Sequence, residues 1–355
     1  MELLIEIILV AGPLILSILL STRKNISRRL KTTVWVICLF ICGVGIYKIV
    51  PERIAKKEES LKEQYKVYLL EREELRESGH PQDYINGLLD NPLTSHYLKE
   101  GKKYETKFKY NKAIEEYRKC LNIPTITTSN KVAVNILIGN CYFNLSELYE
   151  AEKHYIEARI ISRKVNIENE RLMGESVALG NIGLIYRNLG KPEEALKYLN
   201  NALEIDRKIG YEQGIANQLG NIGLIYSDLG KPEEALKYFN DALEIHRKIG
   251  YEQGIANQLG NIGLIYSGLG KLEEALKYHN DALEIDRKIG YEQGIASDLG
   301  NIGVIYRNLG KPEEALKYLN ESLVIFKRVG AQREIGIAEN NISIIEQEIL
   351  KDKLK

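Results

Sequence analysis

The sequence is poor in the residue types that build disulfide frameworks, metal centres and large aromatic cores. Its 355 residues include four cysteines, five histidines, five phenylalanines and a single tryptophan. The cysteines form no paired CxxC pattern, and the histidines form neither an HExxH pattern nor a pair at i,i+4. We therefore expect no metal site and no cofactor.

An excess of charge of one sign is also lacking. The chain carries 49 basic and 49 acidic residues, whereas a nucleic-acid partner requires a clustered basic surface. The glycines of the repeated LGNIG segment follow no predicted strand, which is against a phosphate-binding loop. No set of serine, cysteine and histidine indicates nucleophilic catalysis. We expect neither a nucleic-acid partner nor an enzyme, and we assign no catalytic residue.

Two apolar runs stand near the N-terminus. The first, Leu3–Leu20, contains thirteen Leu, Ile or Val residues, and the second, about 32–50, is uncharged from Thr32 to Tyr47. Their length and hydropathy favour insertion into a bilayer. We therefore predict that residues 1–50 form two transmembrane helices, at about 3–20 and 32–50, joined by a short basic loop.

Two alternatives to this membrane hairpin stay open. The first run resembles a secretory signal peptide, although it begins with Met1-Glu2 and not with basic residues. The second run also fits a buried helix of a globular domain. For the hairpin, the positive-inside rule places the five basic residues of the loop in the cytoplasm, and the repeats on the extracytoplasmic side of a multi-pass membrane protein. Basic residues after the second span favour the opposite orientation: Arg53, Lys56, Lys57 and Lys62.

Residues 51–90 are dense in Glu, Lys and Arg. The segment has no proline between Pro51 and Pro81, and its mixed charges at i,i+4 spacing support a solvent-exposed helix. A dimeric coiled coil is an alternative, although the heptads are poor. We predict a charged helical connector between the membrane helices and the rest of the chain.

A forty-residue period dominates the remaining sequence. Residues 211–250 and 251–290 differ at four positions only: Asp228/Gly268, Pro232/Leu272, Phe239/His279 and His246/Asp286. Each unit contains two amphipathic segments. Most second segments begin with proline, and both kinds of segment end at glycine, which is the usual punctuation of helices. Each unit is therefore predicted to be a pair of helices.

The spacing within each unit resembles the tetratricopeptide repeat, or TPR. In that family a glycine of the first helix is followed by a tyrosine three residues later, a small residue twelve later and another seven further on. The regular copies are Gly183/Tyr186/Ala195/Ala202, Gly223/Tyr226/Ala235/Ala242, Gly263/Tyr266/Ala275/Ala282 and Gly303/Tyr306/Ala315/Ser322. Two divergent copies precede them: Gly101/Tyr104/Ala113/Cys120 and Gly139/Tyr142/Ala151/Ala158. Units of forty residues are similar to those of kinesin light chains and of the spindle-orientation adaptor LGN.

The resemblance implies an all-α protein. A TPR-type α-solenoid of stacked antiparallel helix pairs would follow the two transmembrane helices and the connector. We assign residues 91–330 to six repeats, two divergent and four near-identical, and residues 331–355 to a capping helix with a polar outer face. Gly223 and Ala235 would allow two helices to approach closely, with Leu219, Ile222 and Tyr226 in the core beside them.

The resemblance also indicates a binding surface. In peptide-binding TPR proteins, the asparagine two residues before the signature glycine contacts the backbone of an extended ligand on the concave face. By resemblance we assign this role to Asn181, Asn221, Asn261 and Asn301. Asn217 and Asn257 lie one turn earlier on the same face, and Arg187 and Arg307 lie one to two turns later, where arginine would hold acidic side chains of a ligand. A solvated asparagine ladder inherited by duplication is the alternative.

These features predict a membrane-anchored scaffold that binds an unidentified protein or peptide. Two alternatives remain: a self-assembling structural membrane protein that forms a homo-oligomer, and a sensor or accessory subunit of a complex whose active chain is separate. The 22 tyrosines fall at helical spacing and are predicted to pack in the core. Cys120 and Cys141 would lie close enough to pair if the repeats are extracytoplasmic.

Overall fold

A computed structural model describes residues 92–353 of the chain. The predicted spans at about 3–20 and 32–50, and the connector or coiled coil at 51–90, lie outside the described residues. No strand occurs in the described part, which consists of α-helices and short turns.

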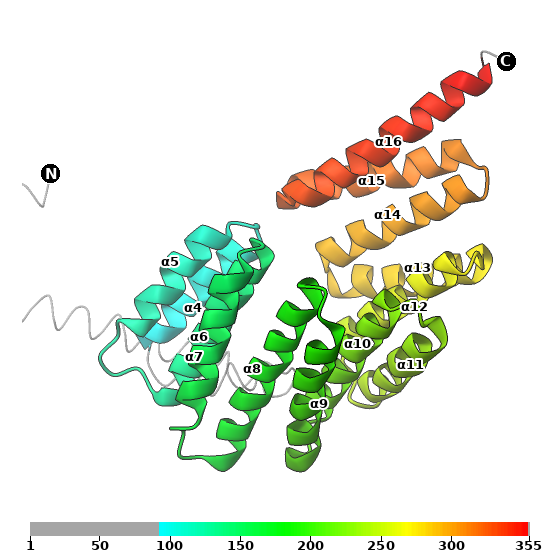
Figure 1. Ribbon diagram of the computed structural model, residues 1–355. Coiled ribbons are helices and arrows are strands. Elements are labelled where there is room, and N and C mark those ends of the chain that lie inside the picture. The colour runs from blue at the N-terminus through cyan, green and yellow to red at the C-terminus, as the bar shows by residue number, and fades with distance from the viewer. Residues whose placement is uncertain (1–91, 354–355) are drawn as a thin grey trace, which may run out of the picture. The chain divides into compact units, whose positions relative to one another are not determined.

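Residues 92–353 form six antiparallel helix pairs followed by one further helix, from α4 in cyan to α16 in red (Figure 1). Each helix packs against the next, and the first helices of successive pairs, from α6 to α16, also touch. This arrangement confirms an all-α solenoid with TPR-type packing. The helices are α4 (Pro92–Glu105), α5 (Tyr110–Leu121), α6 (Thr128–Asn144), α7 (Leu148–Ser162), α8 (Glu168–Asn188), α9 (Pro192–Ile209), α10 (Glu212–Asp228), α11 (Pro232–Lys248), α12 (Glu252–Gly268), α13 (Leu272–Ile289), α14 (Glu292–Asn308), α15 (Pro312–Val329) and α16 (Gln332–Lys353).

Proline and glycine set the helix ends as the sequence predicted. Proline occupies the first turn of α9, α11 and α15, where its missing N–H costs no hydrogen bond. Eight glycines between consecutive helices have positive φ values, from 67° to 86°. An L side chain rarely adopts this conformation, so glycine closes each helix at little cost.

The two helices of a repeat meet at the predicted small residues. A Cβ added to Gly223 in α10 would lie 2.7 Å from Cε1 of Phe239 and 3.3 Å from the carbonyl oxygen of Ala235, both in α11. Leu219 and Ile222 are buried in the core beside this contact, as predicted. The absence of a side chain at Gly223 therefore allows the close packing of α10 on α11.

Tyr226 is only half-buried, because its ring stacks on Tyr238 of α11 at the edge of the core. The ring centroids are 5.2 Å apart, and Lys231 lies over the Tyr226 ring at 5.8 Å. Three further repeats have the same stack: Tyr186–Tyr198, Tyr266–Tyr278 and Tyr306–Tyr318. These stacked tyrosines pack between paired helices at the margin of the core, whereas Tyr117 and Tyr155 of the divergent repeats are fully buried within it.

Consecutive repeats are joined by a second set of close contacts, which involve buried polar residues. Asp206, His246 and Asp286 occupy equivalent positions in α9, α11 and α13 and are at most 3% exposed. Each packs against a glycine of the next helix; a Cβ added to Gly254 would lie 2.6 Å from Nδ1 of His246. Burial lowers the pKa of His246 to about 4 and raises that of Asp206 to about 6, because it disfavours the charged forms.

The polar contact around Asp286 includes a second carboxylate. Asp298 of α14 lies 3.0 Å from Nδ1 of His279 in α13, and both side chains are almost fully buried. Burial raises the pKa of Asp298, and the hydrogen bond from His279 opposes this effect. Asp286 therefore faces a buried charged neighbour as well as a low-dielectric environment.

The turn between α4 and α5 contacts the last repeats. Phe108 takes the place that glycine holds in the regular repeats, with a φ of 53°. Its ring packs on the cluster that contains Leu283, Phe326 and Ala331. A Cβ added to Gly330 would lie 3.6 Å from the carbonyl oxygen of Lys107. A strained backbone persists where surrounding packing fixes it, and here that packing comes from the far end of the solenoid.

No helix between residues 92 and 353 is long and apolar enough to cross a bilayer. On this finding we withdraw the predicted multi-pass membrane localisation with the repeats on the extracytoplasmic side. We also withdraw the lipid bilayer as a predicted partner. The two expected spans themselves lie outside the described residues.

Cys120 and Cys141 are free and buried. The Sγ of Cys120 lies 3.8 Å from the carbonyl oxygen of Thr94, and that of Cys141 lies 3.4 Å from Oε1 of Glu105. Burial raises the pKa of the Cys120 thiol to about 12. The thiols therefore fill small core positions as protonated groups.

The first prediction concerns the glycine contact within a repeat. Gly223→Ala should destabilise the folded chain by about 1–3 kcal/mol, because the new methyl group overlaps the Phe239 ring and approaches the backbone of α11. Urea unfolding followed by circular dichroism would measure the change. Gly336→Ala is the matched control, because nothing lies within 4 Å of that Cβ position. The control should be neutral or stabilising by up to about 1 kcal/mol; equal losses in both variants would contradict the argument.

The second prediction concerns Asp286. Burial, and then the charge of Asp298, raises the pKa of Asp286 to about 7 in the folded chain, against about 3.9 in an unfolded one. The folded state therefore holds this proton more tightly than the unfolded state does. The stabilisation that the proton provides is complete below about pH 4 and is lost as the pH rises through about 7.

Asp286→Asn cannot titrate, so its stability relative to the parent chain should rise by roughly 2–4 kcal/mol between about pH 4 and pH 7. Parallel urea unfolding at several pH values would measure this difference. Asp281→Asn, on the exposed side of α13, controls for the loss of one carboxylate. A difference between Asp286→Asn and the parent that does not change with pH would show that the buried carboxyl is not the titrating group.

Candidate functional site

A cavity of about 420 Å³ runs along the first helices of three consecutive repeats, α8, α10 and α12. We call it the asparagine groove. None of the described residues that line it carries a formal charge. They are Val177, Gly180, Asn181, Tyr211, Gly214, Asn217, Gln218, Gly220, Asn221, Leu224, Asn257, Gln258 and Asn261.

Helical spacing explains why these amides converge. Asn217, Asn221 and Leu224 stand at intervals of four and three residues, so they share one face of α10. Asn257 and Asn261 repeat the pattern on α12, because the repeats are near-identical in sequence. Asn217 and Asn257 are exposed, whereas Asn221 and Asn261 are half-buried. The groove thus has an amide-rich floor with accessible donors and acceptors.

Five of the six asparagines predicted from the sequence line this groove: Asn181, Asn217, Asn221, Asn257 and Asn261. Asn301 occupies the equivalent half-buried position in α14 but is not among the lining residues. The structure therefore brings most of the predicted residues together. Their role in binding stays a prediction.

Two glutamines also line the groove, and neither was predicted from the sequence to be a site residue. Gln218 and Gln258 are 5% and 6% exposed, and the Oε1 atom of each has no hydrogen-bond partner within residues 92–353. Nε2 of Gln218 donates to Oδ2 of Asp206 at 3.3 Å, which leaves its Oε1 as the available acceptor. A buried acceptor without a partner is costly, and residues 92–353 supply neither of these oxygens with a donor.

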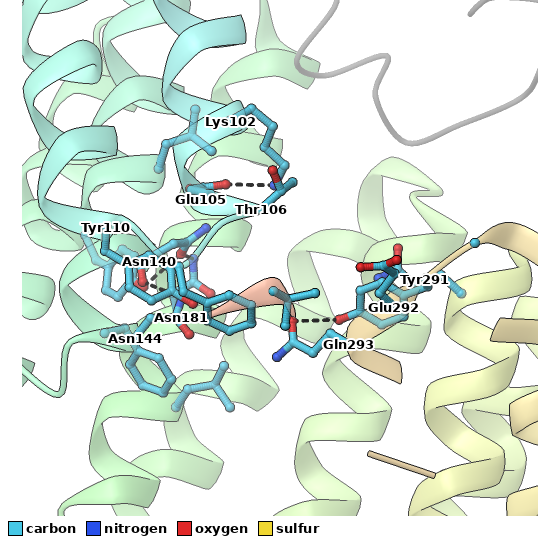
Figure 2. A pocket seen from close by; sticks show the side chains of 18 residues that line it. Lys102, Glu105, Thr106, Tyr110, Asn140, Asn144, Asn181, Tyr291, Glu292 and Gln293 are labelled. Carbon is cyan, nitrogen blue, oxygen red and sulfur yellow. Dashed lines mark hydrogen bonds and ion pairs between the residues drawn. The ribbon is translucent and has the colours of Figure 1, made fainter. Parts of the chain in front are cut away.

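A second cavity, of about 640 Å³, shares Asn181 with the groove (Figure 2). Asn140 accepts hydrogen bonds here from the Tyr155 hydroxyl at 2.8 Å and from Nδ2 of Asn181 at 3.5 Å. On the other side of the cavity, the Tyr291 hydroxyl donates to Oε1 of Gln293 at 3.3 Å. Amide and hydroxyl groups therefore continue beyond the groove toward the N-terminal repeats.

The two arginines predicted for the groove are paired elsewhere. Nη2 of Arg187 lies 3.1 Å from Oδ1 of Asp228, and Nε of Arg307 lies 3.0 Å from Oε2 of Glu348. Each pair is bidentate and joins one repeat to the next. Neither arginine is among the residues that line the two cavities. The prediction treated them as free cations, whereas the structure gives each a carboxylate partner within the chain.

No group of three or more His, Cys, Asp or Glu residues in the described part of the chain could hold a metal ion. The buried His279–Asp298 contact lies between α13 and α14, and Asp286 is its neighbour. The groups available along the groove are neutral amides and hydroxyls. Such groups bind by hydrogen bonding.

Comparison with solved structures finds similar solenoids at low sequence identity. NprR in complex with its cognate peptide NprX matches with a TM-score of 0.55 and 19% identity, over 81% of this chain and 82% of that chain. The Rap conjugation gene regulator of the plasmid pLS20, in complex with the Phr* peptide, matches with a TM-score of 0.53 and 18% identity, over 75% and 76%. A Rap protein complexed with Competence and Sporulation Factor matches with a TM-score of 0.51 and 17% identity, over 73% and 76%. These likenesses concern the fold.

A search of curated proteins finds no match. A family model for the tetratricopeptide repeat matches four overlapping segments, residues 132–208, 174–248, 215–288 and 254–328. Together these segments cover more than half of the sequence. The chain therefore belongs to the tetratricopeptide repeat family.

Proposed function

We propose that this chain is a protein-interaction scaffold that binds an extended peptide segment in the asparagine groove. The observation that carries the proposal is the convergence of five asparagine amides and two unpartnered glutamine oxygens in one cavity. Two structures with a similar fold contain a bound peptide, NprX in one and Phr* in the other, and a third contains Competence and Sporulation Factor. Their likeness supports the kind of ligand, and the groove supplies the chemistry.

An extended peptide exposes one N–H and one C=O per residue, and an asparagine amide can donate to one and accept from the other. Each neutral hydrogen bond contributes about 1 kcal/mol net, so five would contribute about 5 kcal/mol. Micromolar affinity corresponds to about 8 kcal/mol. Apolar contact with Val177 and Leu224, which also line the groove, has to supply the remainder.

The third prediction tests this groove. The double variant Asn221→Ala/Asn261→Ala removes two floor amides and should weaken peptide binding by roughly tenfold to a hundredfold, since two hydrogen bonds are lost. Binding would be measured with peptides selected on the full chain from a capped random library. The helical circular dichroism signal and the melting temperature should stay close to those of the parent chain.

The matched control is Asn240→Ala/Asn280→Ala. These asparagines are exposed on the second helices of the same two repeats, and each donates to a backbone carbonyl one turn earlier. The control should leave affinity unchanged. Equal affinity of both double variants for every selected peptide would place binding outside the groove and overturn the proposal.

A further inference from the structure

We infer that the ligand of the asparagine groove is an uncharged stretch of extended polypeptide, about six residues long and free of proline at the central positions. This inference rests on the proposed function and specifies which peptides it applies to. It follows from the distribution of charge around the groove, from the two buried glutamine acceptors and from the spacing of the first helices.

Neutrality of the groove is the first step. Its lining residues are amides, glycines, a tyrosine and aliphatic side chains, so the cavity contains no cation for an acidic ligand and no carboxylate for a basic one. A charged ligand side chain that entered would lose its hydration without gaining an opposite charge. The loss of hydration is then uncompensated and unfavourable. An uncharged peptide backbone loses less hydration free energy, and the asparagine amides replace its hydrogen bonds to water.

The charges nearest the start of each first helix are paired within the chain. Glu212 pairs with Lys248, Glu252 pairs with Lys288, and Glu292 lies 3.0 Å from Nη2 of Arg328. The same arrangement recurs in three repeats, so it belongs to the repeat design. The net charge of each pair is zero. The electrostatic potential at the start of these helices is therefore weak and attracts a charged ligand little.

The opposite ends of the first helices show the same balance. Arg187 and Arg307 are held by Asp228 and Glu348 in bidentate pairs. The equivalent positions in the two intervening repeats are the uncharged Ser227 and Ser267. In the adjoining cavity Lys102 lies 2.8 Å from Oε2 of Glu105. Arg187, Arg307 and Lys102 are thus paired with carboxylates. Three lysines just beyond the ends of the first helices α8, α10 and α12 lie over tyrosine rings: Lys191, Lys231 and Lys271.

The glutamine acceptors add a requirement for donors. Oε1 of Gln218 and Oε1 of Gln258 stand at equivalent places one repeat apart, and both line the groove. A backbone N–H of the ligand satisfies each of them without introducing charge. Proline has no backbone N–H, so a proline opposite either glutamine would leave that acceptor unpaired.

The length follows from helix packing. Adjacent packed helices lie about 8–10 Å apart, and an extended chain advances about 3.3 Å per residue. One repeat therefore corresponds to about three ligand residues. The groove spans two such steps, from Asn181 to Asn261, which gives about six residues.

The test uses the full chain and three pools of random peptides of about ten residues, long enough to exceed the groove. All peptides are N-acetylated and C-amidated. One pool has no charged residue, one contains Asp and Glu, and one contains Lys and Arg, at matched mean hydropathy. Peptides retained by the immobilised chain are identified by mass spectrometry. The tightest are titrated at about 50 and 500 mM salt, across which exposed charge interactions are strongly screened.

The neutral pool should dominate the retained peptides, with proline depleted at the centre. Their dissociation constants should change less than about twofold between the two salt concentrations, because no net charge is neutralised on binding. The isosteric variant Asn257→Asp introduces an unpaired carboxylate into the groove. It should shift selection toward the basic pool and make affinity decrease as salt is raised.

Retention of mainly acidic or basic peptides by the parent chain, with binding lost in Asn221→Ala/Asn261→Ala, would overturn the inference and leave the groove as the binding site. Retention that is insensitive to both this double variant and Asn257→Asp would overturn the proposed function itself. Failure of every pool to bind would also overturn the proposed function, and the inference with it.

Discussion

The two helices of each repeat meet at a glycine, and the rest of the solenoid depends on that contact. At Gly223 the first helix approaches the second so closely that an added Cβ would overlap Phe239. The same contact recurs at Gly183, Gly263 and Gly303. Because each pair packs in the same way, each presents an equivalent surface to its neighbour, and the solenoid extends by repetition. The asparagines fall in line for the same reason, since they lie two residues before these glycines.

Helix pairs, their ends and most of the groove could be predicted from the sequence. Proline at the start and glycine at the end of a helix act locally, so their effect does not depend on distant residues. Residues forty positions apart occupy equivalent places in successive repeats and have the same local structure. A position such as Asn221 in one repeat therefore predicts the place of Asn261 in the next. For this reason five of the six asparagines that the sequence singled out line one cavity, and their role in binding stays a prediction.

Contacts between repeats were harder to predict, because their partners lie about forty residues apart. The sequence nevertheless contained a signal for the arginine pairs. Among the regular repeats, arginine occurs after the signature tyrosine only where the residue 41 positions later is acidic, as for Arg187 with Asp228 and Arg307 with Glu348. Phe108 gave a similar signal, since it occupies a place that the regular repeats give to glycine. The burial of Gln218 could not be predicted, because it depends on how closely α10 approaches α8 at Gly180.

The four positions at which residues 211–250 and 251–290 differ are absent from the floor of the groove. Residue 228 forms an ion pair, residue 232 begins a helix, and residues 239 and 246 are buried between helices. Duplication has therefore given α10 and α12 the same groove residues, related by a translation of one repeat. The symmetry ends at the neighbouring first helices, where the position of Gln218 and Gln258 is occupied by Ala178 in α8 and by Asp298 in α14. A guest displaced by one repeat toward α14 would therefore meet a buried carboxylate in place of a buried amide, so the sequence differences between repeats favour a single frame along the solenoid.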